Sequence, residues 1–182
     1  MTKSVDGWVQ EIDGKPALDE VAKYLGLTEV DEAHGQSVIV EMGVNHPFLF
    51  QRDNGDFVLR GGLVVDWQKR SFKCSGNVPE GSQFRFSLPA DFNVIDSVIQ
   101  GYEHLKATEM PEADALIMYS CLGRQMIFGP LMSKEVEGVY DVWNVPMAGF
   151  FCNGEIGRSR GGDLEHHAGT VVCAVLREKP VE

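Results

Sequence analysis

Three short segments combine residue types that can do chemistry, and each lies at the end of an apolar run or just before one. They are Ser120-Cys-Leu-Gly-Arg124, Cys152-Asn-Gly-Glu155 and Glu165-His-His167. Because sites are commonly built on loops that leave rigid elements, these segments are the candidate site residues. Their hydroxyl, thiol, guanidinium, carboxylate and imidazole groups suit ligand binding, nucleophilic chemistry or metal binding.

Each charged group in the first two segments has a functional and a structural interpretation. Arg124 offers a planar guanidinium that matches a carboxylate, or it forms a surface ion pair beside a strand–helix turn. Backbone amides at the start of that helix suit an anion. Gly154 allows close approach of a ligand, and Glu155 either binds an amine or pairs within a glycine-rich hairpin. Spacing alone favours the structural role for both.

The cysteines and histidines allow a thiol-dependent enzyme as an alternative. Cys121 or Cys152 would be the nucleophile and His167 the base, although no third, orienting residue stands out. Adjacent residues on a strand point to opposite faces, so His166 and His167 cannot easily bind one ion. The sequence therefore predicts no metal site and favours structural hydrogen bonds for both histidines.

The first half of the chain predicts strands, turns and one helix. A strand over residues 5–12 is followed by an Asp13-Gly14 turn and by a helix that starts at Pro16 and ends at Gly26. Residues 38–40 fit a strand or a buried helix equally well. Gly61-Gly62 predicts a bulge or a close backbone approach. The later expected strands are 48–50, 57–60, 63–67, 71–74 and 83–88.

The second half predicts two amphipathic helices and three buried strands. Asp91 is the expected N-cap of a long helix with apolar residues at helical spacing through Leu105, and a second helix spans 132–143. The strands are expected over 115–119, 147–151 and 170–176. The order indicates an α+β fold, with a mixed, largely antiparallel β-sheet and amphipathic helices packed against it.

Charge and composition restrict the class of protein. The chain has 182 residues, with 16 Lys and Arg against 27 Asp and Glu, for a formal net charge of −11. Nucleic acid and anionic membranes both need a basic footprint, so neither is an expected partner. Without a signal peptide, a membrane span or a C-x-x-C pair, we expect one cytoplasmic domain over residues 1–182 with four reduced thiols.

Several segments in this order resemble the C-terminal part of FIST (F-box and intracellular signal transduction) proteins. They are the opening strand–turn–helix over residues 8–26, the turn Val78-Pro-Glu-Gly81, Ser120-Cys-Leu-Gly-Arg124 and Ala148-Gly-Phe-Phe-Cys-Asn-Gly-Glu-Ile156. Arg60 also stands where the family commonly has an arginine on a strand. The stretch His166-His-Ala-Gly-Thr170 departs from the family pattern, keeping His167 and Thr170.

The resemblance implies a non-enzymatic sensory domain that binds a small ligand, such as an amino acid or related metabolite. In bacteria such domains transmit a signal to downstream signalling proteins. A FIST N-terminal region, absent from this chain, usually precedes the C-terminal part. Arg124 and Arg60 would hold a carboxylate and Glu155 would face an amine. No cofactor is assigned, although haem bound through His167 or His166 is an alternative. The expected ligand-binding residues are Arg60, Ser120, Cys121, Arg124, Cys152, Asn153, Gly154, Glu155 and His167.

Overall fold

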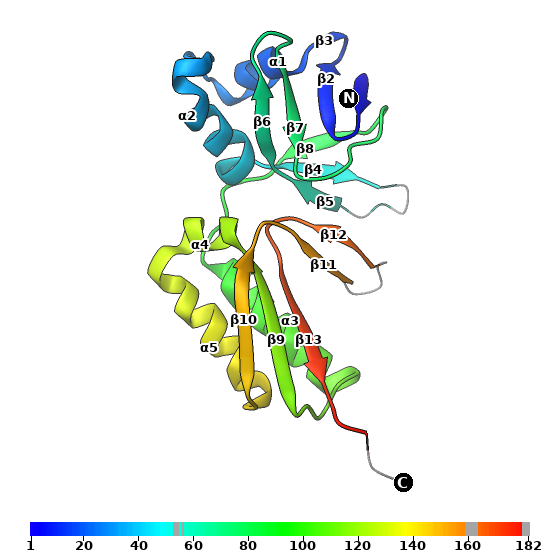
Figure 1. The fold of residues 1–182 in the computed structure, drawn as a ribbon, viewed down its shortest axis with the longest axis vertical. Helices are drawn as coiled ribbons and strands as arrows, with labels where there is room; N and C mark the ends of the chain where they lie inside the picture. Colours follow the sequence, from blue (N-terminus) through cyan, green and yellow to red (C-terminus); the bar gives the residue numbers. More distant parts are fainter. Residues whose placement is uncertain (53–54, 56, 159–163, 180–182) are drawn as a thin grey trace. The chain divides into compact units, whose positions relative to one another are not determined.

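The chain divides into two compact units, Met1–Pro89 and Ala90–Glu182, which are described separately (Figure 1). The structure is a computed structural model, and it describes residues 1–52, 55, 57–158 and 164–179. Within this part of the chain, no helix is long and apolar enough to span a bilayer.

The first unit contains two sheets whose described strand pairs are all antiparallel. The larger sheet has the order β1-β2-β7-β6, with β3 paired to β2, and the smaller has the order β5-β4-β8. Short strands joined by tight turns favour this arrangement. The strands are β1 (Lys3–Val5), β2 (Trp8–Ile12), β3 (Lys15–Pro16), β4 (Phe48–Gln51), β5 (Phe57–Arg60), β6 (Gly62–Asp66), β7 (Ser71–Cys74) and β8 (Phe84–Phe86).

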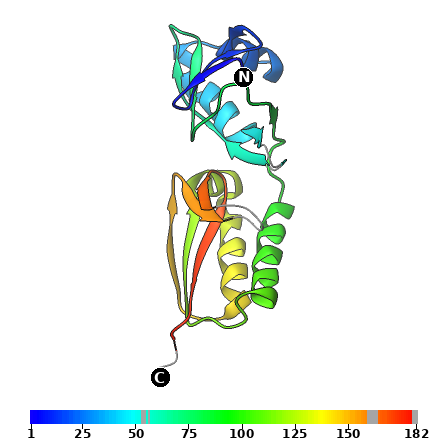
Figure 2. The same ribbon diagram turned by 90° about the vertical axis from the view of Figure 1, so that its right-hand side faces the viewer.

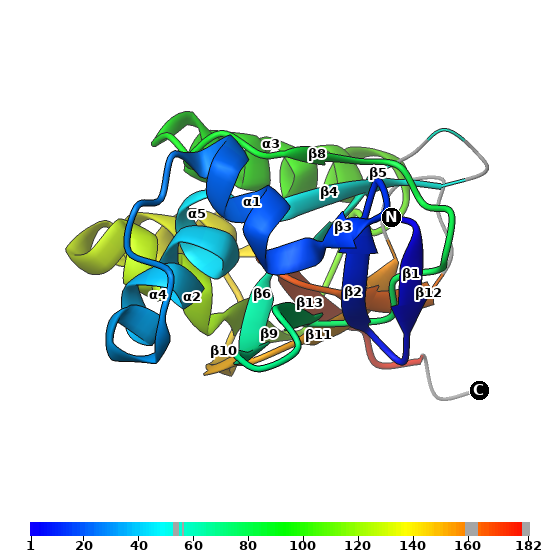
Figure 3. The same cartoon turned by 90° about the horizontal axis from the view of Figure 1, so that it is seen from above.

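The opening segment is a hairpin, which corrects the single strand expected over residues 5–12. Asp6 and Gly7 have φ angles of 49° and 79°, and a two-residue type I′ turn requires positive φ at both of its central positions. The segment therefore divides into β1 and β2, which lie side by side in Figure 3. Asp13 and Gly14 also have positive φ, and the turn predicted there is confirmed.

Helices and aromatic rings complete the core of the first unit. Helix α1 (Ala17–Leu25) ends at Gly26, and α2 (Gly35–Val40) lies between a 3-10 turn (Glu32–His34) and a π turn (Glu41–Asn45). Residues 38–40 are thus helical. The fully buried rings of Phe48 and Phe72 stack with their centroids 5.1 Å apart. The further core residues are Val9, Ile12, Leu18, Val21, Val38, Met42, Phe50 and Val78.

Two glycines confirm the predicted bulge in this unit. The pairing of β6 with β7 shifts register between Gly62 and Val64, as a β-bulge does. A Cβ atom on Gly43 would lie 2.7 Å from the carbonyl oxygen of Gly62, so the two backbones approach too closely for a side chain.

The second unit has two layers (Figure 2), with helices packed on one face of a three-stranded sheet. The sheet order is β10-β9-β13, and β9 pairs parallel with β10 and antiparallel with β13. A separate hairpin joins β11 to β12. The elements are α3 (Asn93–Thr108), β9 (Ala115–Cys121), α4 (Leu122–Phe128), a 3-10 turn (Gly129–Leu131), α5 (Met132–Trp143), β10 (Met147–Cys152), β11 (Glu155–Arg158), β12 (Leu164–His167) and β13 (Val171–Leu176).

Asp91 is expected to be the N-cap of the long helix, but the N-cap falls one residue later, at Phe92, whose side chain forms no capping hydrogen bond. Helix α3 begins at Asn93, and the carboxylate of Asp91 accepts a hydrogen bond from the Asn93 backbone N–H at 3.0 Å. Asp91 thereby satisfies one of the N–H groups left open at a helix start. Met132, Val139 and Trp143 form the buried stripe of α5.

Central strand β9 alternates strictly between the two faces of the sheet. Leu116, Met118 and Ser120 are buried, and the residues between them are half-buried. On the other face, the rings of register partners Tyr119 and Phe150 meet edge to face with centroids 5.3 Å apart. The predicted α+β class with a largely antiparallel sheet is confirmed, because β9–β10 is the one parallel pair among the described strands.

Candidate functional site

A pocket of ≈ 260 Å³ in the second unit is the candidate ligand site. Strand β10 lies at the edge of the described sheet, where its side chains and those of α5 leave a space above β9. Most of the lining residues are apolar, and Ser120 is the polar residue among them. The lining residues are Met118, Ser120, Val136, Met147, Ala148, Gly149, Phe150 and Phe151.

Strand register places the pocket residues opposite one another. Gly149 pairs with Met118 and Phe151 pairs with Ser120. A Cβ atom at position 149 would lie 2.1 Å from the carbonyl oxygen of Met118, so the site requires glycine there. Glycine therefore permits the close approach of the β10 backbone to Met118 at this edge of the sheet.

The hydroxyl of Ser120 is the most informative polar group in the pocket. Ser120 is 3% exposed, and its buried Oγ has no hydrogen-bond partner among the residues that the structure describes. A buried hydroxyl without a partner costs about 1–3 kcal/mol. Such groups are few in native proteins, and among the described residues the hydroxyl of Ser87 in the first unit is another. The predicted site residue Ser120 therefore lines the pocket with unused hydrogen-bonding capacity.

Arg124 forms a buried ion pair, instead of the surface pair considered from the sequence. Its Nε donates to Oε1 of Glu135 at 3.1 Å, and its Nη2 bonds to Oε2 of the same carboxylate. Nη1 donates to the carbonyl of Gly169 at 3.2 Å, and the guanidinium lies 5.3 Å from the Phe128 ring centroid. Arg124 thus holds a carboxylate of its own chain, and its binding of a ligand carboxylate stays a prediction.

Glu155 is 1% exposed, and its carboxylate also accepts hydrogen bonds from within the chain. Its Oε2 accepts hydrogen bonds from the Oγ1 of Thr170 at 3.1 Å and from the Thr170 backbone N–H at 3.4 Å. Its Oε1 accepts one from the Cys152 thiol at 3.3 Å. These contacts tie the start of β11 to β10 and to the loop before β13. Binding of an amine by Glu155 stays a prediction.

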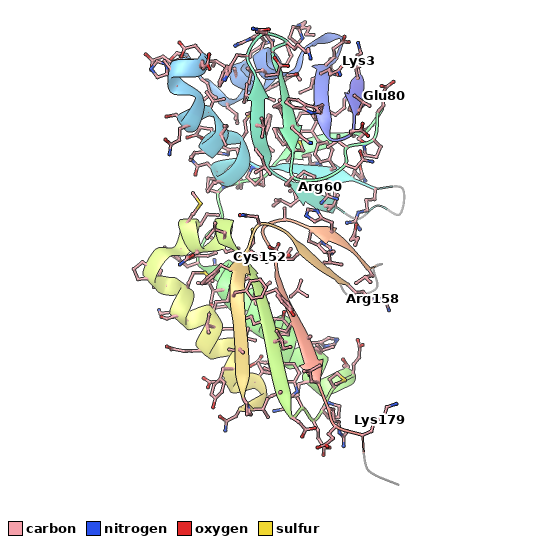
Figure 4. The ribbon with its side chains drawn as sticks, in the orientation of Figure 1. Lys3, Arg60, Glu80, Cys152, Arg158 and Lys179 are labelled. Atoms are coloured by element: carbon pink, nitrogen blue, oxygen red, sulfur yellow. The ribbon has the colours of Figure 1, made fainter. Side chains whose placement is uncertain are left out.

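Cys152 lies at the end of β10 (Figure 4). Burial raises its pKa above the ordinary value, and the hydrogen bond and negative charge of Glu155 raise the pKa further, against a backbone hydrogen bond from Gly154 that lowers it. A raised pKa reduces the thiolate, which is the nucleophilic form. The direction of this pKa shift therefore disfavours Cys152 as an activated nucleophile.

His167 lies beside Glu155 in the β11–β12 register, yet it bonds elsewhere. Its Nε2 is 3.2 Å from the carbonyl oxygen of Gly157 and 4.0 Å from Oε1 of Glu165. Within the part of the chain that the structure describes, no hydrogen bond joins His167 to either cysteine of the proposed enzyme pair. The structural hydrogen bond expected for this histidine is present.

The other predicted site residues fall in different places. Arg60 lies in β5 of the first unit, where its Nη1 donates to the carbonyl of Leu59 (Figure 4). All predicted site residues other than Arg60 belong to the second unit. Asn153 and Gly154 form the turn between β10 and β11. A Cβ atom on Gly154 would meet His166 Nε2 at 2.6 Å, so this glycine accommodates the imidazole.

Sequence reasoning missed the apolar pocket lining and the buried acid Glu135. Glu135 stands three residues after Met132 and four before Val139, on the buried stripe of α5. An acid on an apolar stripe is a signal for a buried partner, because Glu is almost never fully buried alone. Among the described residues, no group of three or more His, Cys, Asp or Glu side chains is placed to hold a metal ion.

Comparisons with known proteins agree with the resemblance seen in the sequence. Two mycobacterial relatives, the uncharacterized proteins Mb0898c of Mycobacterium bovis and MT0897 of Mycobacterium tuberculosis, are each 26% identical over 165 residues. The alignment covers 87% of this chain and 42% of each relative, so the chain spans less than half of their length. No solved structure matches the chain. The FIST C domain model matches residues 17–158, and the chain therefore belongs to this family, which is associated with signal transduction.

Proposed function

We propose that this chain is a non-enzymatic sensory domain that binds a small ligand within a cytoplasmic, bacterial signal-transduction protein. The observation that carries the proposal is the apolar pocket of ≈ 260 Å³ with the unpartnered hydroxyl of Ser120 in its wall. A concave, mostly apolar site with one or a few polar groups is the usual form of a small-molecule site.

The lining indicates the ligand's chemistry. Met118, Val136 and Phe151 offer thioether, aliphatic and aromatic surface, and Ser120 offers one hydroxyl that both donates and accepts. The volume lies below the roughly 300–1,000 Å³ of typical drug-sized sites, so the ligand is a small metabolite. An apolar amino acid or a derivative fits this description, with a polar group on Ser120 and its side chain among the apolar residues.

Signal transmission requires a conformation whose affinity for the ligand differs from that of the resting state. Val136 of the pocket directly follows Glu135, which holds Arg124 of α4. A ligand that contacts α5 therefore acts beside the buried ion pair. The proposed partners are a FIST N-terminal region and a downstream signalling protein.

A thermal-shift screen against apolar amino acids and related metabolites tests this function. A ligand at 100 times its Kd raises the free energy of unfolding by about 2.7 kcal/mol. Val136→Phe fills the pocket and should abolish the shift, whereas Val5→Phe enlarges an exposed residue of the first unit and should preserve it. A shift that survives Val136→Phe, or no shift with any compound, would overturn the proposed site.

A further inference from the structure

Cys121 and Cys152 occupy neighbouring positions on parallel strands. They are register partners at the ends of β9 and β10. Paired strands lie about 4.7–4.9 Å apart, which brings directly opposite side chains within reach of one another. Neither cysteine lines the candidate pocket, so this pair is a feature separate from the proposed ligand site.

The two thiols share one face of the sheet. Tyr119 and Phe150 are also register partners, two residues earlier on each strand, and their rings touch. Side chains repeat every second residue along a strand, so Cys121 and Cys152 follow this pair on the same face. The contact between the rings shows that partners at this register meet across β9 and β10.

The other two cysteines have different surroundings. Cys74 is buried in the core of the first unit, and Cys173 pairs with Met118, which faces the helices. Cys121 and Cys152 are half-buried and carry no disulfide. The chain therefore contains one adjacent pair of free thiols, together with two separate thiols that serve as internal controls.

We infer that Cys121 and Cys152 form a two-thiolate site for a soft monovalent metal ion of the Cu(I) class. Soft thiolate ligands select Cu(I), which is stable with two opposed sulfur ligands. Structural Zn²⁺ takes four protein ligands and catalytic Zn²⁺ three, and the described residues assemble no group of three His, Cys, Asp or Glu side chains. The pair thus suits a metal ion that needs only two protein ligands.

Charge and protons balance in the binding step. Two neutral thiols bind one Cu(I), form two copper–sulfur bonds and release two protons, which leaves a complex with a net charge of −1. Glu155 Oε1 already accepts the hydrogen bond of the Cys152 thiol at 3.3 Å, so an acceptor lies where that proton departs. Neither sulfur changes its oxidation state, and no further reactant is needed.

Anaerobic competition with a chromophoric Cu(I) chelator tests this inference on the reduced 182-residue chain. We expect one Cu(I) per chain and two sulfur neighbours in its X-ray absorption spectrum. Cys121→Ala and Cys152→Ala should each weaken Cu(I) binding by at least about tenfold. Loss of a residue that merely hydrogen-bonds to a metal ligand already costs about that much, and loss of a ligand should cost no less. The matched variants Cys74→Ala and Cys173→Ala should bind as the unmodified chain does.

A second measurement needs no variant. Cu(I) should protect Cys121 and Cys152 from iodoacetamide, as located by peptide mass spectrometry, and leave the labelling of Cys74 and Cys173 unchanged. Equal binding by the chain that lacks both Cys121 and Cys152, or protection of the wrong pair, would overturn the inference. A stoichiometry of one ion per two chains would also overturn it, because the site would then lie between copies.

Discussion

The two units differ in the side chains that they bury most deeply. In the first unit the most deeply buried residues are apolar, with Phe48 and Phe72 the largest. In the second unit the described residues of the same depth are Leu116, Val139 and the two glutamates Glu135 and Glu155. Burying a charge is unfavourable unless it is paired and hydrogen-bonded, and both glutamates are.

This difference supports the placement of both proposed sites in the second unit. Apolar packing serves stability, whereas buried charges and an unpartnered hydroxyl are features that proteins retain at functional or specificity-determining positions. Ser120, Arg124, Glu135 and Glu155 lie in the second unit, and the first unit also buries Glu20, Arg60 and Ser71, although none of its charged side chains is as deeply buried as Glu135 and Glu155. The proposed ligand site and the proposed metal site belong to this unit, and four predictions test the comparison.

Phe48→Ala should destabilise the first unit by about 3–5 kcal/mol, because a large cavity replaces a fully buried ring. Urea denaturation measures the change, and hydrogen exchange assigns it to a unit. Phe57→Ala is the matched control. Because Phe57 is 39% exposed, this variant should lose much less free energy of unfolding. Equal acceleration of exchange in both units would show that they unfold together, and the comparison between their cores would fail.

Glu135→Leu should cost a similar amount, about 3–5 kcal/mol, because it leaves the buried Arg124 guanidinium without its carboxylate counter-charge. Adding Arg124→Leu should restore most of the loss, since the double variant buries no charge, and a double-mutant cycle measures this coupling. For the exposed pair of Arg177 and Glu112, Glu112→Leu should change stability by about 1 kcal/mol or less. A double variant as unstable as Glu135→Leu would contradict the importance of the pair.

Alkaline pH should weaken the first unit through Cys74. Burial raises the pKa of this thiol from 9.0 to about 12, against a smaller lowering by Arg60. As pH rises, the unfolded chain loses the Cys74 proton before the folded chain does. The contribution of this thiol to the free energy of unfolding is therefore complete below pH 9 and is lost as pH rises toward 12. At a pH of about 10.5 the loss is about 2 kcal/mol. Urea curves for Cys74→Ala should lack this component, and parallel pH profiles for the two proteins would contradict it.

Ser120→Ala should have the smallest effect on stability, between zero and a gain of about 1 kcal/mol, because it removes a buried hydroxyl that has no partner. Thr170→Val is the control, because the Thr170 hydroxyl donates to Glu155 and its loss should destabilise the protein. Thermal unfolding measures both variants. A clear loss of stability in Ser120→Ala would mean that the hydroxyl has a structural role, which would weaken the ligand proposal.

Much of the fold is predictable from local patterns. The helical spacing of Met132, Val139 and Trp143 predicted α5, and the apolar run from Ala115 predicted β9. Alternation over residues 5–12 predicts one strand, whereas the Asp6–Gly7 turn signal within it favours the hairpin that the structure shows. Asp-Gly between apolar residues is a strong hairpin signal.

The candidate site was only partly predictable. Ser120, Cys121, Cys152 and Glu155 were identified by residue type, and their roles depend on partners that are distant in the sequence. Ser120 and Phe151 are 31 positions apart in the printed sequence and become pocket neighbours through the β9–β10 register. No local pattern specifies that register, because many pairings satisfy the same apolar alternation.

Local sequence therefore specifies the elements and the residue types available for chemistry, since backbone preferences and side-chain periodicity act over a few residues. Tertiary packing decides which of those residues meet. It pairs Arg124 with Glu135, leaves the hydroxyl of Ser120 unpartnered in a pocket, and brings Cys121 beside Cys152. These outcomes depend on strand register and on burial, which arise only when distant segments pack together.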